Sequence, residues 1–394
     1  MRNGSWCRVL ALTVLLATAC TAARPTAVLS PTPSEPARLS PTPSATATPT
    51  ATPTTSPPTT ATANPVQPEC WPVQQPPRFA PSTPSNRNLA IVWLRGSNDK
   101  LVRDVSDVDH PSTVATLDIP SHDVRFVSAT DVSWIWSDQR NNLFRTAFAT
   151  RTNTLVAACP PFLFDWSPDG TTAVYRSSSA LRQVNSGNDR VFGDLPPFPI
   201  TGCESQTCAD NWEFRLLYSP DGALISLVEN VAVSRLRIWT KDGMLVKSID
   251  SNSPLTMSVW SGSGLYFRNA GGVQVWRNGT LSEVLPGVLW IALKASPGGG
   301  KIVYAIRDGS GLPHVGLLDA ASGTARELAS SRNAPSFMSS RYLWYRGERL
   351  CTSSDSCATG LTIATGKTYI YDLVSGTESE SIITEVADVW PHPA

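Results

Sequence analysis

Short apolar runs follow one another from residue 70 to residue 394, and most of them end in Gly, Pro, Asn or Asp. No stretch in this region places apolar side chains at helical spacing for more than a turn or two. Runs that are rich in β-branched and aromatic residues and end in turn-forming residues are typical of β-strands. The pattern therefore predicts an all-β domain.

One unit, an apolar strand followed by a turn and a second apolar strand, recurs within this domain. Its clearest copies are FLFDWSPDGTTAVYR and FRLLYSPDGALISLVE, in which an Asp-Gly pair supplies the tight turn. In six copies the residue before the turn serine is Val127, Trp166, Tyr218, Trp260, Ala295 or Met338. Neighbouring copies lie 35 to 52 residues apart, a period that suits the four-stranded blade of a β-propeller.

A hairpin completes each unit, and seven such hairpins follow one another along the chain. They are LVRDVSDVDHPSTVATL, LFRTAFATRTNTLVA, LRQVNSGNDRVF, LRIWTKDGMLVKSI, VQVWRNGTLSEVL, HVGLLDAASGTARELA and YIYDLVSGTESESI. One innermost strand is missing, because the first unit begins at its second strand, NLAIVWLR. The chain ends in EVADVWPHP, whose Trp390-Pro391 matches the endings of the other innermost strands. We therefore expect a seven-bladed β-propeller that the C-terminal strand closes within the first blade.

These repeats resemble those of TolB-like and WD-type propellers, and the resemblance covers Asn88 to Ala394. It implies the propeller architecture and says almost nothing about function, because propellers carry many unrelated activities.

The first residues have the pattern of a bacterial lipoprotein signal. Arg2 and Arg8 precede an apolar run that is too short to span a bilayer, and Leu16-Ala17-Thr18-Ala19-Cys20 resembles a lipobox. We expect residues 1–19 to be removed and Cys20 to carry the lipid. The alternative is an ordinary cleaved signal peptide followed by a structural Cys20.

Residues 20–69 consist almost entirely of Pro, Thr, Ser and Ala. Such a composition buries too little apolar surface to offset the entropy of ordering, so we expect a disordered stalk between the anchor and a domain at 70–394. Pro-rich chains extend by about 3 Å per residue. The stalk would therefore hold the propeller well away from the membrane.

Six further cysteines lie beyond Cys20: Cys70, Cys159, Cys203, Cys208, Cys351 and Cys357. An even number in an exported chain indicates disulfides. The spacings favour Cys203 with Cys208 and Cys351 with Cys357, which leaves Cys70 for Cys159. A zinc site made from the two short pairs is the alternative.

Composition and motifs exclude several functions. The net charge is zero, with 32 basic and 32 acidic residues, so nothing favours nucleic acid. We find no nucleophile elbow, zinc-protease motif or phosphate loop, and we expect no catalytic residues, metal or cofactor.

The four histidines are not spaced along the sequence as the ligands of one metal ion would be. The acidic run from Asp104 to Asp109 is either a hard-cation site or a solvated turn.

An arginine ends the second strand in five of the seven units: Arg95, Arg176, Arg268, Arg307 and Arg346. In register, these side chains would form a ring at the mouth of the propeller and bind an anionic ligand through forked hydrogen bonds. Alternatively, they pair with acids of neighbouring blades such as Asp308 or Glu348.

Together, these observations lead us to expect a monomeric, lipid-anchored lipoprotein on the outer side of the cytoplasmic membrane. Its propeller would be a binding module for a protein, peptide or cell-wall polymer, and we favour this interpretation over an enzyme. Two alternatives remain open. One is a glycan lyase, hydrolase or quinone-dependent dehydrogenase whose active site is scattered over several blades, and the other is an accessory lipoprotein of an envelope sensor or transport complex.

Overall fold

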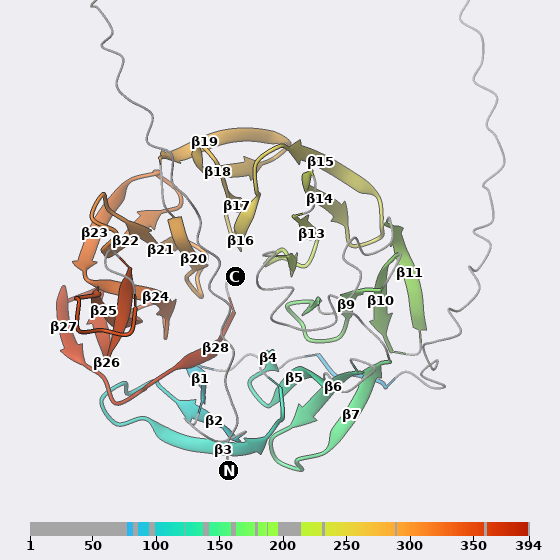
Figure 1. The fold of residues 1–394 in the computed structure, drawn as a ribbon. Coiled ribbons are helices and arrows are strands. Elements are labelled where there is room, and N and C mark those ends of the chain that lie inside the picture. The colour runs from blue at the N-terminus through green and yellow to red at the C-terminus, as the bar shows by residue number, and fades with distance from the viewer. Residues whose placement is uncertain are drawn as a thin grey trace, which may run out of the picture. The chain divides into compact units, whose positions relative to one another are not determined.

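In the computed structural model, the described residues form 28 β-strands, which make up seven four-stranded antiparallel sheets arranged around a centre (Figure 1). The structure describes residues 77–81, 86–93, 99–121, 123–136, 142–158, 163–177, 180–186, 188–195, 214–230, 233–287, 290–357 and 361–392. The signal sequence, Cys20 and the stalk lie outside these ranges. All described residues belong to one compact unit. The protein is thus a seven-bladed β-propeller, which confirms the predicted fold class.

The four strands of each blade follow one another from the centre of the ring to its rim. From innermost to outermost, blade 1 is β28 (Val386–Trp390), β1 (Leu89–Trp93), β2 (Asp99–Asp104) and β3 (Ser112–Asp118). Blade 2 is β4 (Val124–Ser128), β5 (Asp131–Trp136), β6 (Asn142–Ala147) and β7 (Asn153–Ala157). Blade 3 is β8 (Phe164–Trp166), β9 (Ala173–Arg176), β10 (Ala180–Asn185) and β11 (Asn188–Asp194). Blade 4 is β12 (Arg215–Tyr218), β13 (Leu224–Glu229), β14 (Ser234–Thr240) and β15 (Leu245–Ser251).

The remaining blades follow the same order. Blade 5 is β16 (Thr256–Ser261), β17 (Gly264–Asn269), β18 (Gly272–Arg277) and β19 (Thr280–Pro286). Blade 6 is β20 (Trp290–Ala295), β21 (Lys301–Arg307), β22 (Pro313–Asp319) and β23 (Ala325–Ser330). Blade 7 is β24 (Arg332–Phe337), β25 (Tyr342–Leu350), β26 (Thr362–Asp372) and β27 (Thr377–Glu380).

The C-terminal strand closes the ring as the sequence predicts. Strand β28 pairs antiparallel with β1, so that Trp390 lies opposite Leu89 and Val389 opposite Ala90. Because β28 and β1 come from opposite ends of the domain, blade 1 joins these two ends within one hydrogen-bonded sheet.

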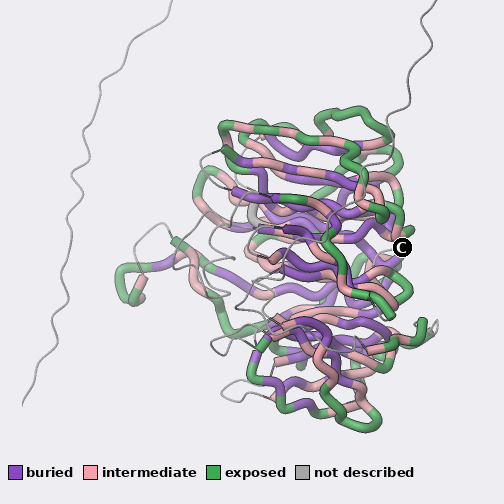
Figure 2. The backbone as a smooth tube through the Cα atoms, turned by 90° about the vertical axis from the view of Figure 1, so that its right-hand side faces the viewer, coloured by how far each residue is buried: buried purple, intermediate pink, exposed green. Residues whose placement is uncertain are grey.

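Burial follows the position of a strand within its blade (Figure 2). Strand β13, second from the centre, is buried at almost every position, whereas the outermost strand β15 is mostly exposed. Central strands are covered on both faces by neighbouring blades, and this explains their almost continuous apolar sequences. Seven clusters of buried apolar side chains result, one at each interface between adjacent blades.

The repeated SPDG sequence forms the turn between the first and second strands of a blade. In blade 3 the Asp169 carboxylate accepts hydrogen bonds from the Ser167 hydroxyl (2.5 Å) and the Thr171 amide (3.1 Å). Gly170 adopts a left-handed φ of 66°, which glycine reaches without steric cost. The turn of blade 4 repeats these bonds with Ser219 and Asp221. Local chemistry therefore sets the path of the chain at this end of the blades.

The segment that precedes the first strand packs against the same end of blades 2 and 3. The Phe79 ring lies edge-on to Trp166, with 5.0 Å between centroids, and the Arg145 guanidinium lies 4.7 Å from the Phe79 ring centroid. Arg145 also donates to the Gly170 carbonyl oxygen (2.8 Å) and to the Asp131 carboxylate (2.8 Å). One arginine thus connects the entering chain to two neighbouring blades.

Candidate functional site

Charged residues interrupt the innermost strands, which converge on the centre of the ring (Figure 1). On β24, Arg332 pairs with Glu378 of the same blade. The other charged residues are Arg125 on β4, Asp165 on β8, Arg215 on β12, Lys294 on β20 and Asp388 on β28, joined by Asp123 and His392 just outside β4 and β28. We call these seven residues the channel cluster. Innermost strands are covered by neighbouring blades, so a charged side chain there must either face the central channel or bond to a neighbouring blade.

Blade 1 is connected to blade 2 through Asp388. Its Oδ2 atom accepts hydrogen bonds from the amide of Phe126 on β4 (2.7 Å) and from Nε2 of His392 (3.1 Å). Burial alone would lower the pKa of His392, but the charges of Asp388 and Asp165 and the Asp388 hydrogen bond raise it. Burial favours a higher pKa for Asp388, yet His392 and the Phe126 amide hold it below its ordinary value. His392 and Asp388 therefore form an ion pair when the imidazole is protonated.

Blades 2, 3 and 4 continue this chain of contacts. Arg125 donates to the Phe164 carbonyl oxygen (3.2 Å), and its Nη1 atom lies 3.7 Å from Oδ1 of Asp165. The other carboxylate oxygen of Asp165 accepts a hydrogen bond from the Tyr218 amide (2.7 Å). Burial raises the pKa of Asp165, and the Arg125 charge only partly offsets this effect. Charged side chains thus connect blades 1 to 4 next to the channel.

Lys294 differs from the other charges of the cluster. Within the described parts of the chain it forms no ion pair, and it is solvent-exposed although β20 is the innermost strand of blade 6. Burial lowers the pKa of Lys294, as do the charges of Arg215 and Arg125, whereas Asp388 acts in the opposite direction. Since these three residues belong to blades 4, 2 and 1, Lys294 reaches into the space that the blades surround.

The innermost strand of blade 5 carries buried hydroxyls without partners. Thr256 and Ser258 are 4% and 7% exposed, and neither Oγ1 of Thr256 nor Oγ of Ser258 makes a hydrogen bond with a described residue. Met257 between them has a left-handed φ of 54°, and the pairing of β16 with β17 shifts register at this point. Buried polar atoms without partners cost free energy, of about 1–3 kcal/mol each. Strands β28 and β8 each carry one such atom, Nε1 of Trp390 and of Trp166, so β16 differs from them in having two among the described residues.

The five arginines at the ends of second strands occupy different environments. Arg176 is completely buried and pairs with Glu229 of blade 4 at 2.9 Å. Arg307 donates to the Gly311 carbonyl oxygen and the Thr362 hydroxyl, and it lies 3.7 Å from Glu348. Arg346 lies 3.9 Å from the same carboxylate, Arg268 is half-buried, and Arg95 lies outside the described residues. The arginines thus form contacts within and between blades, and their binding of an anionic ligand stays a prediction.

A disulfide joins Cys351 to Cys357 in the connection between β25 and β26, with Cα atoms 6.0 Å apart. Cys70, Cys159, Cys203 and Cys208 lie outside the described residues, as does Cys20.

The remaining sequence candidates form local contacts. In the acidic turn, Asp107 accepts hydrogen bonds from the Asp109 amide and from His110. His314 lies between Asp308 and Glu327, at 2.9 and 2.8 Å. No group of three His, Cys, Asp or Glu side chains in the described ranges is arranged to hold a metal ion. Among those same residues, no helix is long and apolar enough to cross a membrane.

The channel cluster was not among the residues that the sequence pattern singled out. A signal was nevertheless present, because Arg125, Asp165, Lys294 and Asp388 are single charges within the otherwise largely apolar strands VRFVS, FDW, WIALKA and VADVW. A charge at that position is unusual in a strand covered on both faces.

The architecture and this site define the class of protein, a seven-bladed β-propeller with a charged central channel. Comparison of the sequence with models of known families finds no match, and comparison with curated proteins finds none either. Solved structures share the fold. The oligogalacturonate lyase determined in complex with manganese is 11% identical, with a TM-score of 0.47 and coverage of 76% of this chain and 85% of that one.

Two further structures are similar at the same level. TolB from Acinetobacter baumannii is 15% identical with a TM-score of 0.41, and the match covers 61% of this chain and 62% of TolB. The tricorn protease is 11% identical with a TM-score of 0.48, over 79% of this chain and 36% of the protease. The structural neighbours of this β-propeller thus include TolB and a lyase.

Proposed function

We propose that this chain is a lipid-anchored, extracytoplasmic binding module whose propeller receives an anionic group of a protein, peptide or cell-wall polymer at the central channel. Lys294 is the observation that carries the proposal. Its side chain is accessible to solvent on an innermost strand and forms no ion pair within the described residues. Protein nevertheless surrounds it, and the partial loss of hydration, together with the charges of Arg215 and Arg125, lowers its pKa.

The acids of the cluster are already engaged, so they leave this positive charge without a partner. Asp388 accepts bonds from His392 and a blade 2 amide, and Asp165 accepts one from a blade 4 amide. A carboxylate or phosphate beside Lys294 would reduce the repulsion between the three cations and raise the pKa of the lysine again. The contacts that join blades 1, 2, 3 and 4 in turn favour binding, because a preorganised surface loses little entropy when a ligand binds.

Binding is tested with fluorescein-labelled hexaglutamate, and hexaglutamine serves as the uncharged control peptide. We expect the acidic peptide alone to bind, with an affinity that falls as salt is added. Lys294→Met should weaken binding about tenfold or more, whereas Lys241→Met, at an exposed hairpin turn of blade 4, should not. Equal binding of both peptides, or equal affinity of both variants, would contradict the proposal.

The lipid anchor is tested separately in cells. The full-length protein should fractionate with membranes and incorporate labelled palmitate, and Cys20→Ser should lose both properties. Membrane association without palmitate incorporation would show that another element holds the protein there.

A second candidate, an enzyme, is favoured by one observation. Asp165 lies 3.7 Å from Arg125, Asp388 accepts from His392, and both carboxylates act on His392, so they share one cluster. Burial raises the pKa of Asp165, whereas His392 holds that of Asp388 below its ordinary value, and two carboxylates shifted apart in this way can serve as an acid and a base. Hydrolysis or elimination of an acidic polysaccharide such as polygalacturonate, abolished by Asp165→Asn with the fold intact, would support it. The binding proposal predicts no turnover of that polymer.

A further inference from the structure

Two strands of blade 7 extend beyond the sheet that contains them (Figure 1). Strand β25 has nine residues and β26 has eleven, whereas the second and third strands of the other blades have four to seven. After an irregularity, the two strands pair again from Glu348 with Ala364 to Leu350 with Thr362. Among the described strands, neither β24 nor β27 pairs with this section. We call residues 348–364 the blade 7 arm, of which the structure describes 348–357 and 361–364.

The base of the arm is tied to blade 6. Arg307 donates to the Thr362 hydroxyl (2.8 Å), and this hydroxyl donates to Oε2 of Glu348 (2.6 Å). The other carboxylate oxygen of Glu348 accepts a hydrogen bond from the side-chain amide of Asn333 (2.6 Å). Glu348 is only 7% exposed, so these donors replace the water that its carboxylate loses. The arm therefore starts from a fixed position on the ring.

The tip of the arm is held by a disulfide and an ion pair. The Cys351 amide donates to the Leu361 carbonyl oxygen (2.8 Å), and a disulfide joins Cys351 to Cys357. Two guanidinium nitrogens of Arg349 donate to the Asp355 carboxylate, at 2.7 Å each. An isolated two-stranded hairpin is only marginally stable in water. These contacts restrict the conformations of the arm and so lower the entropy that binding of a partner would cost.

One edge of the arm carries unpaired backbone groups. The Glu348 amide donates to the Ser331 carbonyl oxygen (2.9 Å), so it points away from β26. In an antiparallel pair, opposite residues direct their backbone groups either toward each other or both outward. Ala364, opposite Glu348, therefore directs its N–H and C=O away from β25, and by the same alternation so does Thr362, opposite Leu350. Among the described residues, these outward groups have no hydrogen-bond partner.

Neither a charge nor a proline protects this edge. Residues 361–366 read LTIATG, and Leu361 is 58% exposed. Natural proteins usually block free strand edges with charges, prolines or covering segments, because an open edge pairs with other chains. Six of the seven outermost strands carry a charged residue, such as Lys247 on β15 or Glu283 on β19. The outer edge of β26 in the arm therefore has the properties of a pairing surface.

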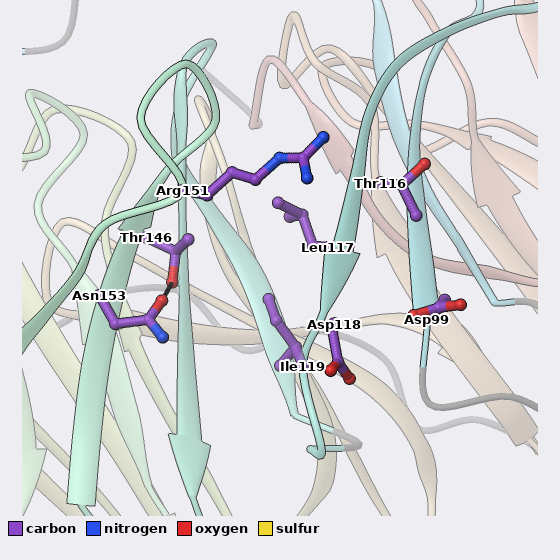
Figure 3. A pocket seen from close by; sticks show the side chains of 8 residues that line it. All are labelled: Asp99, Thr116, Leu117, Asp118, Ile119, Thr146, Arg151 and Asn153. Carbon is purple, nitrogen blue, oxygen red and sulfur yellow. Dashed lines mark hydrogen bonds between the residues drawn. The ribbon is translucent and has the colours of Figure 1, made fainter.

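The cleft of about 330 Å³ between blades 1 and 2 lacks such a defined set of groups (Figure 3). Its blade 1 side is lined by the apolar side chains of Leu117 and Ile119. On the blade 2 side, the Thr146 hydroxyl donates to the side-chain oxygen of Asn153 (2.7 Å), and Arg151 extends from the turn between β6 and β7. The cleft thus selects no one class of ligand, whereas the edge of β26 does.

We propose that the blade 7 arm binds an extended segment of a partner polypeptide, which adds to the outer edge of β26 as a third strand. A peptide backbone presents an N–H and a C=O at every second residue along one edge, and the outward groups of Thr362 and Ala364 repeat in the same way. Leu361 and Ile363 lie on one face of the strand, where β-branched side chains of the segment would pack beside them. The arm does not include the channel cluster, so this inference does not rest on the anion site.

The test follows the fluorescence anisotropy of the labelled peptide KTVTVTK as full-length protein is added. The control is the same peptide with an N-methyl group on every inner residue, because methylation removes the backbone donors and keeps the side chains. We expect only the unmethylated peptide to bind. This comparison uses the unaltered protein, so it does not depend on the folding of any variant.

Two substitutions at one position test the edge itself. Ala364→Pro removes the outward N–H and should weaken binding of the peptide by about tenfold or more, whereas Ala364→Thr keeps this N–H and should bind as the unaltered protein does. Proline is tolerated in an edge strand where the N–H faces solvent, so we expect equal thermal midpoints for both variants. Hexaglutamate binding at the channel should be the same in both, which separates this site from the anion site.

The proposal is overturned if KTVTVTK does not bind, if its methylated form binds equally, or if folded Ala364→Pro binds the peptide as tightly as Ala364→Thr. Should Ala364→Pro prove unstable, the two peptides decide the question on the unaltered protein. Sedimentation of the protein alone tests another occupant of the edge. A dimer that Ala364→Pro converts to monomers would assign the edge to a second copy of this chain and overturn its assignment to a partner.

Discussion

The two sides of the central channel are built differently. From blade 1 to blade 4, charged side chains on the innermost strands bond to the next blade, through Asp388, Arg125 and Asp165 in turn. In blades 5 and 6, Thr256 and Ser258 leave their hydroxyls without partners and Lys294 forms no ion pair among the described residues. The comparison teaches that charged contacts between blades hold one side of the ring together, whereas the other side contains more polar groups that have no partner among the described residues.

The largest loss of stability is expected from breaking the buried ion pair between Arg176 of blade 3 and Glu229 of blade 4. Arg176→Met leaves Glu229 buried without this partner, and Arg237, at 2.8 Å, compensates only in part. Breaking a buried pair from one side costs about 3–5 kcal/mol of unfolding free energy. Urea denaturation measures the loss. If Arg176→Met is instead stable and loses only ligand affinity, this arginine belongs to a binding ring.

Asp388→Ala should have the next largest effect. The substitution removes the acceptor of the Phe126 amide and the partner of His392 at the seam closed by β28. We expect a loss of about 1–3 kcal/mol, the cost of a buried donor left without a partner. Thermal unfolding of Asp388→Ala beside Asp242→Ala tests this, and equal midpoints would mean that the carboxylate does not hold the two blades together.

A change of pH should alter stability less than these substitutions do, and stability should fall as the pH rises. The raised pKa of His392 contributes stability below the unfolded pKa, and this contribution is lost as the pH rises through the folded value. Asp388 and Asp165 favour the protonated ring, whereas Arg125 opposes it. We expect the unfolding midpoint to fall as the pH rises above the ordinary histidine pKa of about 6.5 and through the higher folded value. In His392→Gln this fall should be reduced, and an unchanged slope would assign the dependence to other groups.

The smallest change in stability is expected in blade 5, where Thr256 lies on the innermost strand. Thr256→Val removes a buried hydroxyl that has no hydrogen-bond partner in the part of the chain that the structure describes, so the unfolding free energy should stay constant or rise by up to about 1 kcal/mol. If the hydroxyl serves the anionic ligand, binding of hexaglutamate should weaken at the same time. Loss of stability in Thr256→Val would indicate that the hydroxyl has a structural partner.

The sequence predicts the fold well because the fold depends on local signals. SPDG turns, apolar strands and a C-terminal run that matches the innermost strands predict the blades and their closure, and the observed sheets confirm both. These signals lie within a few residues of one another. The period of the repeat then determines the number of blades.

The channel cluster could not be predicted in the same way, since it joins residues from five blades. Asp388 and the Phe126 amide are 262 positions apart, and charges on three other blades affect the pKa of Lys294. Sequence also does not distinguish an arginine at a mouth from one in a buried pair. Arg176 and Arg268 end equivalent strands, yet only Arg176 is fully enclosed.

The contact of Phe79 with Arg145 and Trp166 has a mechanical consequence. If the chain is held at Cys20, any tension along it arrives from the N-terminal side and meets this contact before it reaches β1. The load then falls on the seam between blades 2 and 3, where Arg145 holds a carbonyl of blade 3 and a carboxylate of blade 2. Strand β28, which closes the ring from the other end of the chain, would be spared that force.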